Sequence, residues 1–326
     1  MGTPHRIDVH HHLFPPRYVV EATPERILGN SSAAQRGPLD WSPAKSIDEM
    51  DQNGIAASIT SIAPPGVWFG DDQAACRLTR ECNEYAARMT QDYPGRFGVF
   101  ASLPLPDIDG TLREIEYAFD ALKVDGVVLM TSFGRKWPGD PLFAPVFTEL
   151  NRRNAVVYLH PTVPDCCRNL IPEIPDSTIE FPMDTTRAIV SLLYSGTFSR
   201  CPGIRFIFSH AGGMLPFVAE RVSRLAQRGF QSRIPNGPMH ELKKLFYETT
   251  LATSPMALSS LMHLVAASQV LFGSDFPFVQ AVRSVEGLAR YGFSADDLRA
   301  IERENALGLF PRLAYSGGRA RNGETP

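Results

Sequence analysis

Residues 6–15 read Arg-Ile-Asp-Val-His-His-His-Leu-Phe-Pro, and this stretch says most about the fold. The run from Arg6 to His10 is short and mainly apolar, which is typical of a buried strand. A doubly wound sheet that binds a nucleotide has a glycine-rich phosphate-binding turn after its first strand. Here the strand runs instead into three histidines, so the stretch disfavours a nucleotide site and places imidazoles at a strand end.

Seven further strand-like runs follow, and longer segments separate them. In several of these segments apolar residues recur every three or four positions, as in Leu112, Ile115 and Phe119, which is typical of amphipathic helices. The expected strands are Arg6–His10, Ala57–Ala63, Phe97–Leu103, Gly126–Thr131, Ala155–His160, Ile204–Ser209, Leu245–Thr250 and Gln269–Phe272. The expected helices are Asp72–Tyr93, Ile108–Leu122, Pro141–Arg153, Met183–Gly196, Leu215–Gly229, Ser254–Ala267 and Ser294–Phe310.

Alternating strands and helices indicate an α/β fold with parallel strands and right-handed crossovers. Eight such units in about 300 residues fit a closed (β/α)8 barrel better than an open sheet. We therefore predict one domain over residues 1–313 and a flexible tail over residues 314–326, where serine, glycine, arginine and asparagine are frequent.

Two connections exceed ordinary length, residues 13–44 after strand one and residues 161–182 after strand five. Both leave the carboxyl end of a strand, which is the face of a barrel where active sites are built. We interpret them as insertions that form a lid or a pocket wall.

The composition excludes several classes of protein. Lys and Arg total 32 against 35 Asp and Glu, a formal net charge of -3 without a long basic run, so nucleic acid is a poor candidate partner. Five cysteines without CxxC pairing, and an amino terminus with His5 and Arg6 in place of an apolar signal core, indicate a reduced cytoplasmic protein. The most apolar long stretch, residues 257–273, is interrupted by polar residues, so no membrane segment is expected.

Histidines and one aspartate stand at matching strand ends. His10 and His12 are two apart, so in an extended chain they share a face, while His11 points away. His160 ends strand five, and His210 and Asp275 end strands six and eight. One such residue caps a turn more often than it binds an ion, but five of them at one end of a barrel predict a mononuclear metal site.

The ligand types narrow the metal and the chemistry. Imidazoles with one carboxylate favour Zn²⁺ first, with Mn²⁺ as the alternative. A second metal would need a bridging lysine at a central strand end, and Gly126–Met130 contains none. Asp275 and His210 are the candidates for proton transfer beside the ion.

Four motifs stand in order along the chain: Ile7-Asp8-Val9-His10-His11-His12, His160-Pro161, Ser209-His210-Ala211-Gly212-Gly213 and Gly273-Ser274-Asp275-Phe276-Pro277. They resemble those of the amidohydrolase superfamily. Within it they are similar to the aminocarboxymuconate-semialdehyde decarboxylase group, which includes γ-resorcylate and 6-methylsalicylate decarboxylases, over residues 5–313.

The resemblance implies a distorted TIM barrel with one divalent ion on His10, His12, His160 and Asp275, and His210 as the catalytic histidine. In salicylate-like members a protonated aspartate, matching Asp275, delivers a proton to the ring carbon that bears the carboxylate, and carbon dioxide leaves. The implied activity is the non-oxidative decarboxylation of a small hydroxylated aromatic acid.

The resemblance also implies substrate contacts and a homodimer. Arg221, eleven residues after His210, resembles an arginine that crosses a dimer interface to hold a substrate carboxylate. A second carboxylate-binding arginine has no clear match, because its nearest candidate, Arg36, is poorly placed. Trp68 after strand two and Phe278 after strand eight are expected to form aromatic pocket walls.

Two alternatives remain from the sequence. The same ligands suit a metal-dependent hydrolase or hydratase that acts on a lactone or an unsaturated acid and activates water. A barrel that binds metal or an aromatic ligand without catalysis is a third class. Loss of carbon dioxide release in His210 and Asp275 variants would separate the first reading from the third.

Overall fold

The computed structural model describes residues 4–29 and 37–315, and Arg36 and residues 316–326 lie outside this range. Within it, parallel strands form one eight-stranded sheet in sequence order, as predicted. The strands are β1 (Arg6–Leu13), β2 (Ile55–Ile62), β3 (Phe97–Ser102), β4 (Gly126–Met130), β5 (Val156–His160), β6 (Arg205–Phe208), β7 (Phe246–Glu248) and β8 (Val270–Leu271). The shortening from eight residues in β1 to two in β8 makes this a distorted TIM barrel.

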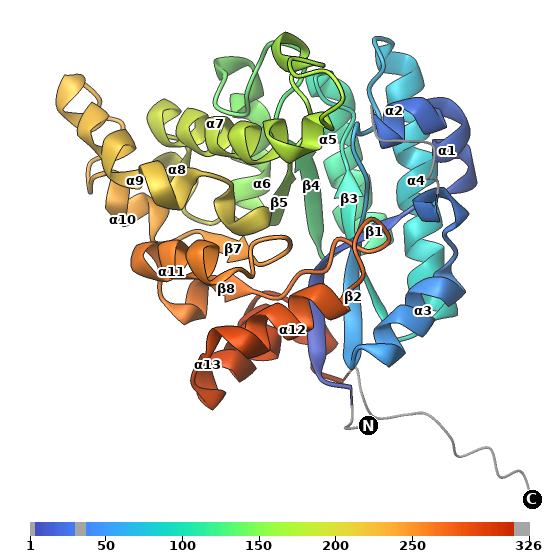
Figure 1. Cartoon of the computed structure of the whole chain (residues 1–326). Helices are drawn as coiled ribbons and strands as arrows, with labels where there is room; N and C mark the ends of the chain where they lie inside the picture. Colours follow the sequence, from blue (N-terminus) through green and yellow to red (C-terminus); the bar gives the residue numbers. More distant parts are fainter. Residues whose placement is uncertain (1–3, 30–36, 316–326) are drawn as a thin grey trace, which may run out of the picture.

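Helices surround the sheet and connect successive strands (Figure 1). All the helices expected from periodicity are present in whole or in part, and α12, which the periodicity did not predict, follows β8. The helices that follow β2 are α4 (Asp72–Asp92), α5 (Ile108–Tyr117), α6 (Ala144–Arg152), α7 (Glu180–Ser195), α8 (Thr197–Arg200), α9 (Leu215–Ser223), α10 (Pro238–Leu242), α11 (Pro255–Leu264), α12 (Val282–Tyr291), α13 (Ala295–Arg299) and α14 (Asn305–Leu309).

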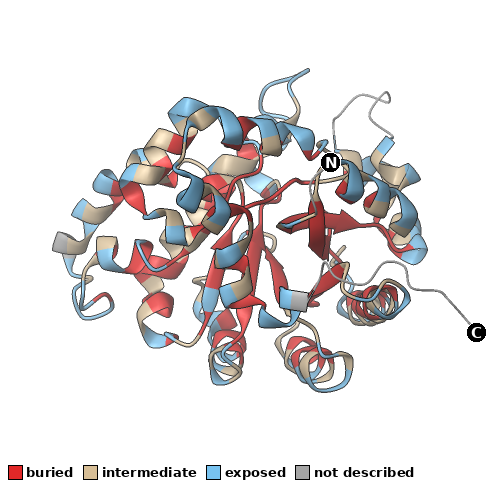
Figure 2. Ribbon diagram, turned by 90° about the horizontal axis from the view of Figure 1, so that it is seen from below, coloured by how far each residue is buried: buried red, intermediate tan, exposed pale blue. Residues whose placement is uncertain are grey.

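The strands are coloured as buried and helices surround them (Figure 2), so both faces of the sheet are covered. Inside the barrel, Val9, Ile59, Phe100 and Tyr158 form a packed apolar layer, with the Phe100 and Tyr158 rings stacked at 5.2 Å. Leu313 and other residues near the end of the described chain join this layer. The barrel interior is therefore a filled core, and polar groups concentrate at the carboxyl ends of the strands.

The barrel closes between its first and last strands through irregular backbone. Val9 donates its N–H to the Phe272 carbonyl at 3.0 Å, and His12 donates to the Phe276 carbonyl at 2.7 Å. Asp275, whose φ is 66°, donates its N–H to the His10 carbonyl at 2.7 Å. This seam fixes residues 272–276 beside the histidines of β1.

The connection after β1 contains more regular structure than its composition indicates. It holds α1 (Pro16–Ala22), α2 (Pro24–Leu28) and a 3-10 turn at Gly37–Asp40, and α3 (Pro43–Gln52) begins inside the expected insertion. Each α-helix starts with proline at its first position, where the missing N–H has no intrahelical partner. The Ser42 hydroxyl caps α3 by accepting from the Lys45 N–H.

The connection after β5 carries the 3-10 turns Asp165–Cys167 and Asp176–Thr178 before α7. Among the helices of the described residues, none combines the length and the apolar character that crossing a bilayer requires.

Candidate metal centre

Four side chains that the sequence placed at strand ends meet in one cluster. His10 and His12 come from β1, His160 ends β5 and Asp275 follows β8, and one ligand atom from each lies within 4.8 Å of the others. Asp275 Oδ1 is 2.9 Å from His12 Nε2 and 3.2 Å from His10 Nε2. Ligand atoms bound to one ion at about 2.0–2.1 Å must lie roughly 3 Å apart, so these spacings suit a shared ion.

The three imidazoles are held in one orientation by acceptors on their outer side. Nδ1 of His160 contacts the Pro161 carbonyl at 2.8 Å, and Nδ1 of His12 contacts the Ser61 carbonyl at 3.3 Å. Nδ1 of His10 contacts the Glu248 carboxylate at 3.0 Å. Because these oxygens can only accept, each Nδ1 carries the proton and each Nε2 presents a lone pair to the cluster when the ring is neutral.

The Nε2 atom of His160 is buried and has no hydrogen-bond partner among the described residues. A buried polar atom without a partner is rare in folded proteins and calls for a ligand. Its position beside His12 and His10, with ring centroids 4.9 Å away in both cases, points it at the same space. The residues present therefore fit a divalent cation.

Burial and mutual charge set the protonation of the cluster. Burial lowers the pKa of His12 and lowers the pKa of His160 well below its usual range, which leaves both rings neutral. Burial acts the same way on His10, but the Asp275 and Glu248 carboxylates outweigh it and raise its pKa to about 10. A cation at this position would take the place of that proton.

Asp275 is ionised in this setting. Burial alone would raise the pKa of its carboxyl group, but His10 and the neighbouring imidazoles outweigh burial and lower the pKa well below the usual range. A carboxylate beside neutral imidazoles is the donor set that the sequence predicted for Zn²⁺ or Mn²⁺.

His210 lies beside the cluster on a strained turn after β6. Its Nε2 is 4.0 Å from Asp275 Oδ2, and its Nδ1 is buried without a partner in the described chain. The backbone is left-handed at His210, with φ 52°, and at Ala211, with φ 55°, conformations that few residues other than glycine adopt. Such strain is concentrated at functional sites.

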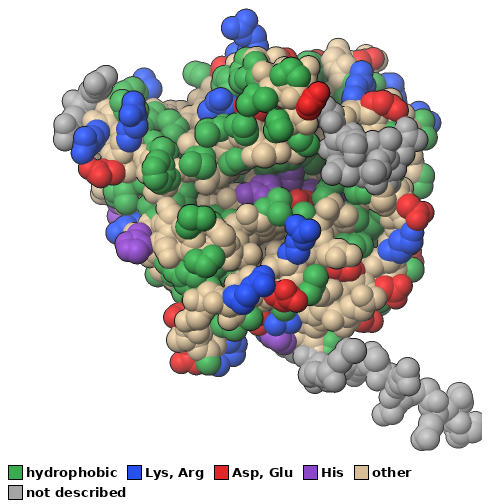
Figure 3. Space-filling model, in the orientation of Figure 1, with side chains coloured by type: hydrophobic (Ala, Val, Ile, Leu, Met, Phe, Trp, Pro, Cys, Tyr) green, Lys and Arg blue, Asp and Glu red, His purple; other side chains and the backbone are tan. Residues whose placement is uncertain are grey.

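The cluster is reached from the surface. Figure 3 shows a hollow in this face of the molecule with histidine side chains at its floor. The side chains of His210 and Asp275 each keep 11% of their surface exposed, whereas those of His10 and His12 keep none. The open side of the cluster is therefore the side where a small molecule would meet His210 and Asp275.

A cavity of about 390 Å³ adjoins the metal-ligand strands. Met130, in its wall, is the register partner of His160, and Ile62, also in its wall, follows the carbonyl that holds His12. The lining is mixed, because the arginines Arg26 and Arg168 stand among apolar side chains, and the Arg26 guanidinium lies 5.0 Å from the Phe69 ring. This volume lies within the range of small-molecule pockets, about 300–1,000 Å³.

Comparison with known proteins assigns the family. The model of the family described as amidohydrolase matches residues 7–312. The chain belongs to the amidohydrolase family.

Named relatives of this amidohydrolase are decarboxylases. It is 36% identical to a decarboxylase of Aspergillus niger over 94% of this chain and 88% of that protein. It is 34% identical to the 6-methylsalicylic acid decarboxylase of Penicillium expansum over 94% of this chain and 97% of that protein. Among solved structures, an amidohydrolase II matches with a TM-score of 0.86 at 29% identity, over 94% of this chain and 99% of that chain.

The residues expected to touch substrate lie at different distances from the cluster of this amidohydrolase. The Phe278 ring is 5.5 Å from the His12 ring and 5.8 Å from Phe14. Trp68 lines the cavity and donates its Nε1–H to Asp72 Oδ1 at 2.7 Å. Arg221 is exposed on the last turn of α9, and the described chain offers it no hydrogen bond or ion pair.

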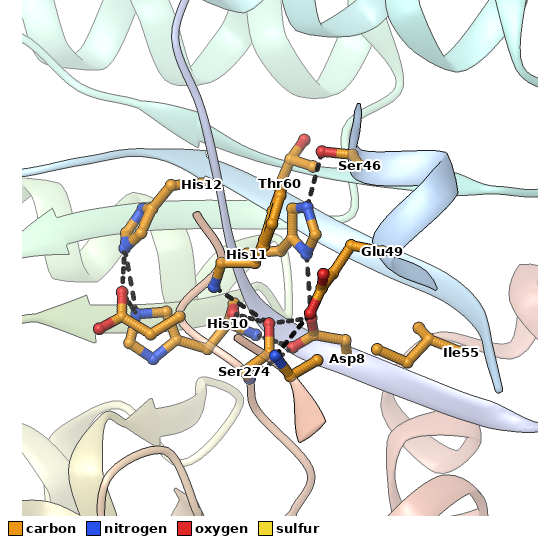
Figure 4. Close-up of polar contacts among 12 residues, drawn as sticks. Asp8, His10, His11, His12, Ser46, Glu49, Ile55, Thr60 and Ser274 are labelled. Carbon is orange, nitrogen blue, oxygen red and sulfur yellow. Dashed lines mark hydrogen bonds and ion pairs between the residues drawn. The ribbon is translucent and has the colours of Figure 1, made fainter. Parts of the chain in front are cut away.

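Two carboxylates beneath the metal site were missed in the sequence. Glu248 ends β7 and bonds His10, and Asp8 lies two residues before His10 on β1. Asp8 Oδ1 accepts the His10 and Ser274 N–H groups, both at 3.0 Å. Its Oδ2 accepts the Ser274 hydroxyl at 2.6 Å and contacts His11 Nδ1 at 3.0 Å (Figure 4).

His11 points away from the cluster, as the alternation of a strand predicts. Its Nε2 lies 2.8 Å from the Ser46 hydroxyl of α3, which also accepts from Trp41 Nε1 at 2.8 Å (Figure 4). Ser46, His11 and Asp8 thus have the connectivity of a hydrolytic triad, but all three are fully buried. No substrate can reach this serine, so the network serves to join β1, β8 and α3.

Proposed function

We propose that this amidohydrolase is a metal-dependent, non-oxidative decarboxylase of a small hydroxylated aromatic acid. The observation that carries the proposal is the set of three buried imidazoles whose Nε2 atoms face Asp275, with His210 beside them. Relatives that match nearly the full chain are named decarboxylases, and one of them acts on 6-methylsalicylic acid.

The proposed ion is a single Zn²⁺, with Mn²⁺ as the alternative, held by His10, His12, His160 and Asp275. When bound, the ion would draw charge from the hydroxyl or carboxylate oxygen of the substrate and lower the pKa of that group. The protein residues fix the geometry: three Nδ1–H donors are already committed to Glu248, Ser61 and Pro161.

The proposed reaction replaces the carboxylate of the ring with a proton. Direct loss of carbon dioxide would leave an aryl carbanion, so the ring carbon is protonated first. His210 and Asp275, 4.0 Å apart on the open side, are the proposed groups for this transfer. Because Asp275 is ionised in the structure, it must first take up a proton before it can deliver one. The bond to the carboxylate then breaks, its electron pair restores aromaticity, and carbon dioxide leaves.

The proposed pocket combines the hollow above the cluster with the adjoining cavity. The edge of Phe278 beside His12 supports a wall for an aromatic ring, and Trp68 supports a second wall farther from the ion. Ile62 and Met130 give the cavity wall apolar side chains that suit a substituted ring. A monoacid is the proposed substrate class, because the second carboxylate-binding arginine expected for a dicarboxylate substrate has no clear match in the sequence.

The assembly is proposed as a cytoplasmic homodimer whose protomers are single barrels over residues 1–313. Arg221 is exposed and has no partner among the described residues, which supports a role at an interface. Phe217, one turn before it, is 80% exposed, and Met256 on the adjoining α11 is 84% exposed. Apolar side chains this exposed beside an arginine are typical of contact surfaces.

The test measures carbon dioxide release from a panel of salicylates and resorcylates, with and without chelator and with Zn²⁺ or Mn²⁺ restored. The proposal predicts metal-dependent release that His210→Ala and Asp275→Asn abolish. A matched control is Asp125→Asn, a carboxylate at the opposite end of the barrel, which should leave kcat unchanged. Turnover of lactones or esters alone would identify a hydrolase instead.

The role of Arg221 is tested by mixing subunits. An Arg221→Ala chain and a His210→Ala chain, each inactive alone, should regain activity when combined, because a hybrid dimer then contains one intact shared site. Failure to regain activity in verified hybrids would argue against a site shared between protomers.

A further inference from the structure

Glu248 is a buried carboxylate at the end of β7 and contacts two parts of the site at once. Its side chain has no exposed surface. Oε1 contacts His10 Nδ1 at 3.0 Å and accepts the His210 N–H at 2.6 Å. Oε2 accepts the Thr250 N–H at 2.6 Å. One carboxylate therefore joins a metal-ligand imidazole, the turn of the proposed catalytic histidine and its own strand end.

The contact with His10 decides which ring nitrogen faces the ion. A carboxylate accepts only, so Nδ1 keeps its proton, and Nε2, 3.2 Å from Asp275 Oδ1, is the nitrogen whose proton an ion would replace. The Nδ1 atoms of His12 and His160 bond backbone carbonyls in the same way, but carbonyls carry no net charge. His10 is the ligand held by a charged acceptor, and such outer carboxylates strengthen metal binding.

The contact with His210 acts on the backbone. His210 and Ala211 are both left-handed, and Gly212 and Gly213 continue the positive φ values. The N–H of His210 points at Glu248, which gives this unfavourable turn a charge-assisted hydrogen bond. Glu248 thereby places the His210 imidazole, 4.0 Å from Asp275, through a hydrogen bond to the His210 backbone and not to its ring.

A second cation is the competing explanation, since His10, His210 and Glu248 also bring ligand atoms within 4.8 Å of one another. It would require His10 to give up both ring protons, because Nε2 already faces the first cluster. The 3.0 Å separation from Glu248 is that of a hydrogen bond. The geometry favours a hydrogen-bonding role for the carboxylate.

We propose that Glu248 is a positioning residue that couples the metal site to the proton-transfer site by holding His10 and the His210 turn on one carboxylate. The half concerning His210 rests on the proposed decarboxylase function, whereas the half concerning metal affinity does not. The consequence is that one substitution weakens metal binding and slows catalysis even when the metal site is saturated.

The test is Glu248→Gln, which keeps the shape of the side chain but offers one accepting oxygen to three N–H groups. Co²⁺ serves as the probe, since its visible absorption reports the ligand geometry. We expect Co²⁺ affinity to fall about 10-fold to 100-fold with an altered band shape. At saturating Co²⁺ we expect kcat to remain below the wild-type value, while KM changes less than twofold.

The matched control is Glu302→Gln. Glu302 is also buried and also contacts a histidine, His5. It accepts a hydrogen bond from Arg6 as well, and this group lies at the opposite end of β1 from the metal site. This variant should lose thermal stability without any change in Co²⁺ affinity or spectrum. If both variants alter Co²⁺ binding equally, the effect is general loosening of the fold and the proposal is wrong.

Other outcomes would overturn the proposal or separate it from the proposed function. Wild-type Co²⁺ affinity and spectrum in Glu248→Gln, or two tightly bound Co²⁺ per wild-type chain, would overturn the proposal. If Glu248→Gln fails to fold, Glu248→Asp, which keeps the charge but shortens the reach, must show the same weakened Co²⁺ binding or the proposal fails. Absence of decarboxylation in the wild type would refute the proposed function but leave the metal-affinity result interpretable.

Discussion

Asp8→Asn is the substitution that tests most directly how the fold supports the metal site. The carboxylate is fully buried and accepts the N–H groups of His10 and Ser274, the Ser274 hydroxyl and a ring N–H of His11. Asparagine has almost the same shape but no charge and only one accepting oxygen. The change therefore isolates the hydrogen-bonding chemistry from packing.

The magnitude follows from the four contacts. If the amide oxygen stays on the two backbone N–H groups, the amide nitrogen faces the other two donors. The Ser274 hydroxyl can turn to the His10 carbonyl, 3.3 Å away, but His11 must change its tautomer. Hydrogen bonds to a charged group are worth about 1 kcal/mol more than neutral ones. We expect a loss of about 2–4 kcal/mol and, for a chain of this size, a Tm lower by roughly 3–6 °C.

The same change should weaken metal binding, because Asp8 ties the Ser274 backbone, next to Asp275, to β1. The assay pairs calorimetric Tm with Co²⁺ titration. Asp125→Asn is the control, since Asp125 is a buried carboxylate that accepts the Val99 N–H and pairs with Arg312 at the opposite end of the barrel. A Tm within 1 °C of wild type for Asp8→Asn would refute the reasoning, as would an equal loss of Co²⁺ affinity in the control.

Three further predictions concern stability and reactivity. The Arg152 hydrogen bond lowers the pKa of Glu149 to about 2, so its stabilisation is present above the unfolded pKa near 4.5 and is lost as pH falls toward 2. The pair is partly exposed, so it contributes about 1 kcal/mol or less. The difference in Tm between wild type and Glu149→Gln should therefore shrink from pH 7 to pH 3, and a constant difference would contradict this. Iodoacetamide at pH 8 should modify the exposed Cys166 first and spare Cys82, whose pKa burial raises, until the protein unfolds, as peptide mass mapping would show. Leu159→Ala should lower stability by about 2–5 kcal/mol in denaturant titrations, since the side chain has no exposed surface; a smaller loss would mean that the core collapses around the gap.

The clustering of His10, His12, His160 and Asp275 was predictable because a parallel barrel gathers its strand ends at one face. The position of His160 could be predicted once the end of its strand was known, and that of Asp275 once its turn was placed after the last strand. His10 and His12 needed the period of two along β1. The eight strands themselves were recognisable because burial on both faces makes most of them short, mainly apolar runs.

Glu248 and Asp8 were not predictable in the same way. Each lies inside a run whose other residues indicate a strand, and neither belongs to a spacing that is typical of a metal site. Their roles depend on contacts with residues far away in the chain, such as Ser274 for Asp8, 266 positions away. A buried acidic residue within an apolar strand is the one signal that could have identified both, since such a charge needs a partner.

The helices α1 to α3 were missed because prolines and glycines in this segment resemble those of a loop. A proline can begin a helix or end one, and only the neighbouring residues indicate which of the two occurs. For α3 the signal was present, in Ser42 as the cap and in Ile47 and Met50 spaced as on one helix face.

The closing seam of the barrel has a consequence for biosynthesis. The proposed metal site takes His10 from β1 and Asp275 from the segment after β8, and the contacts that place them join these two parts of the chain. A nascent chain therefore has no complete site until the residues through Asp275 have left the ribosome. Ion binding would then stabilise only chains in which β1 already contacts the segment after β8. Chains that stop before Asp275 would lack this stabilisation and would be open to proteolysis.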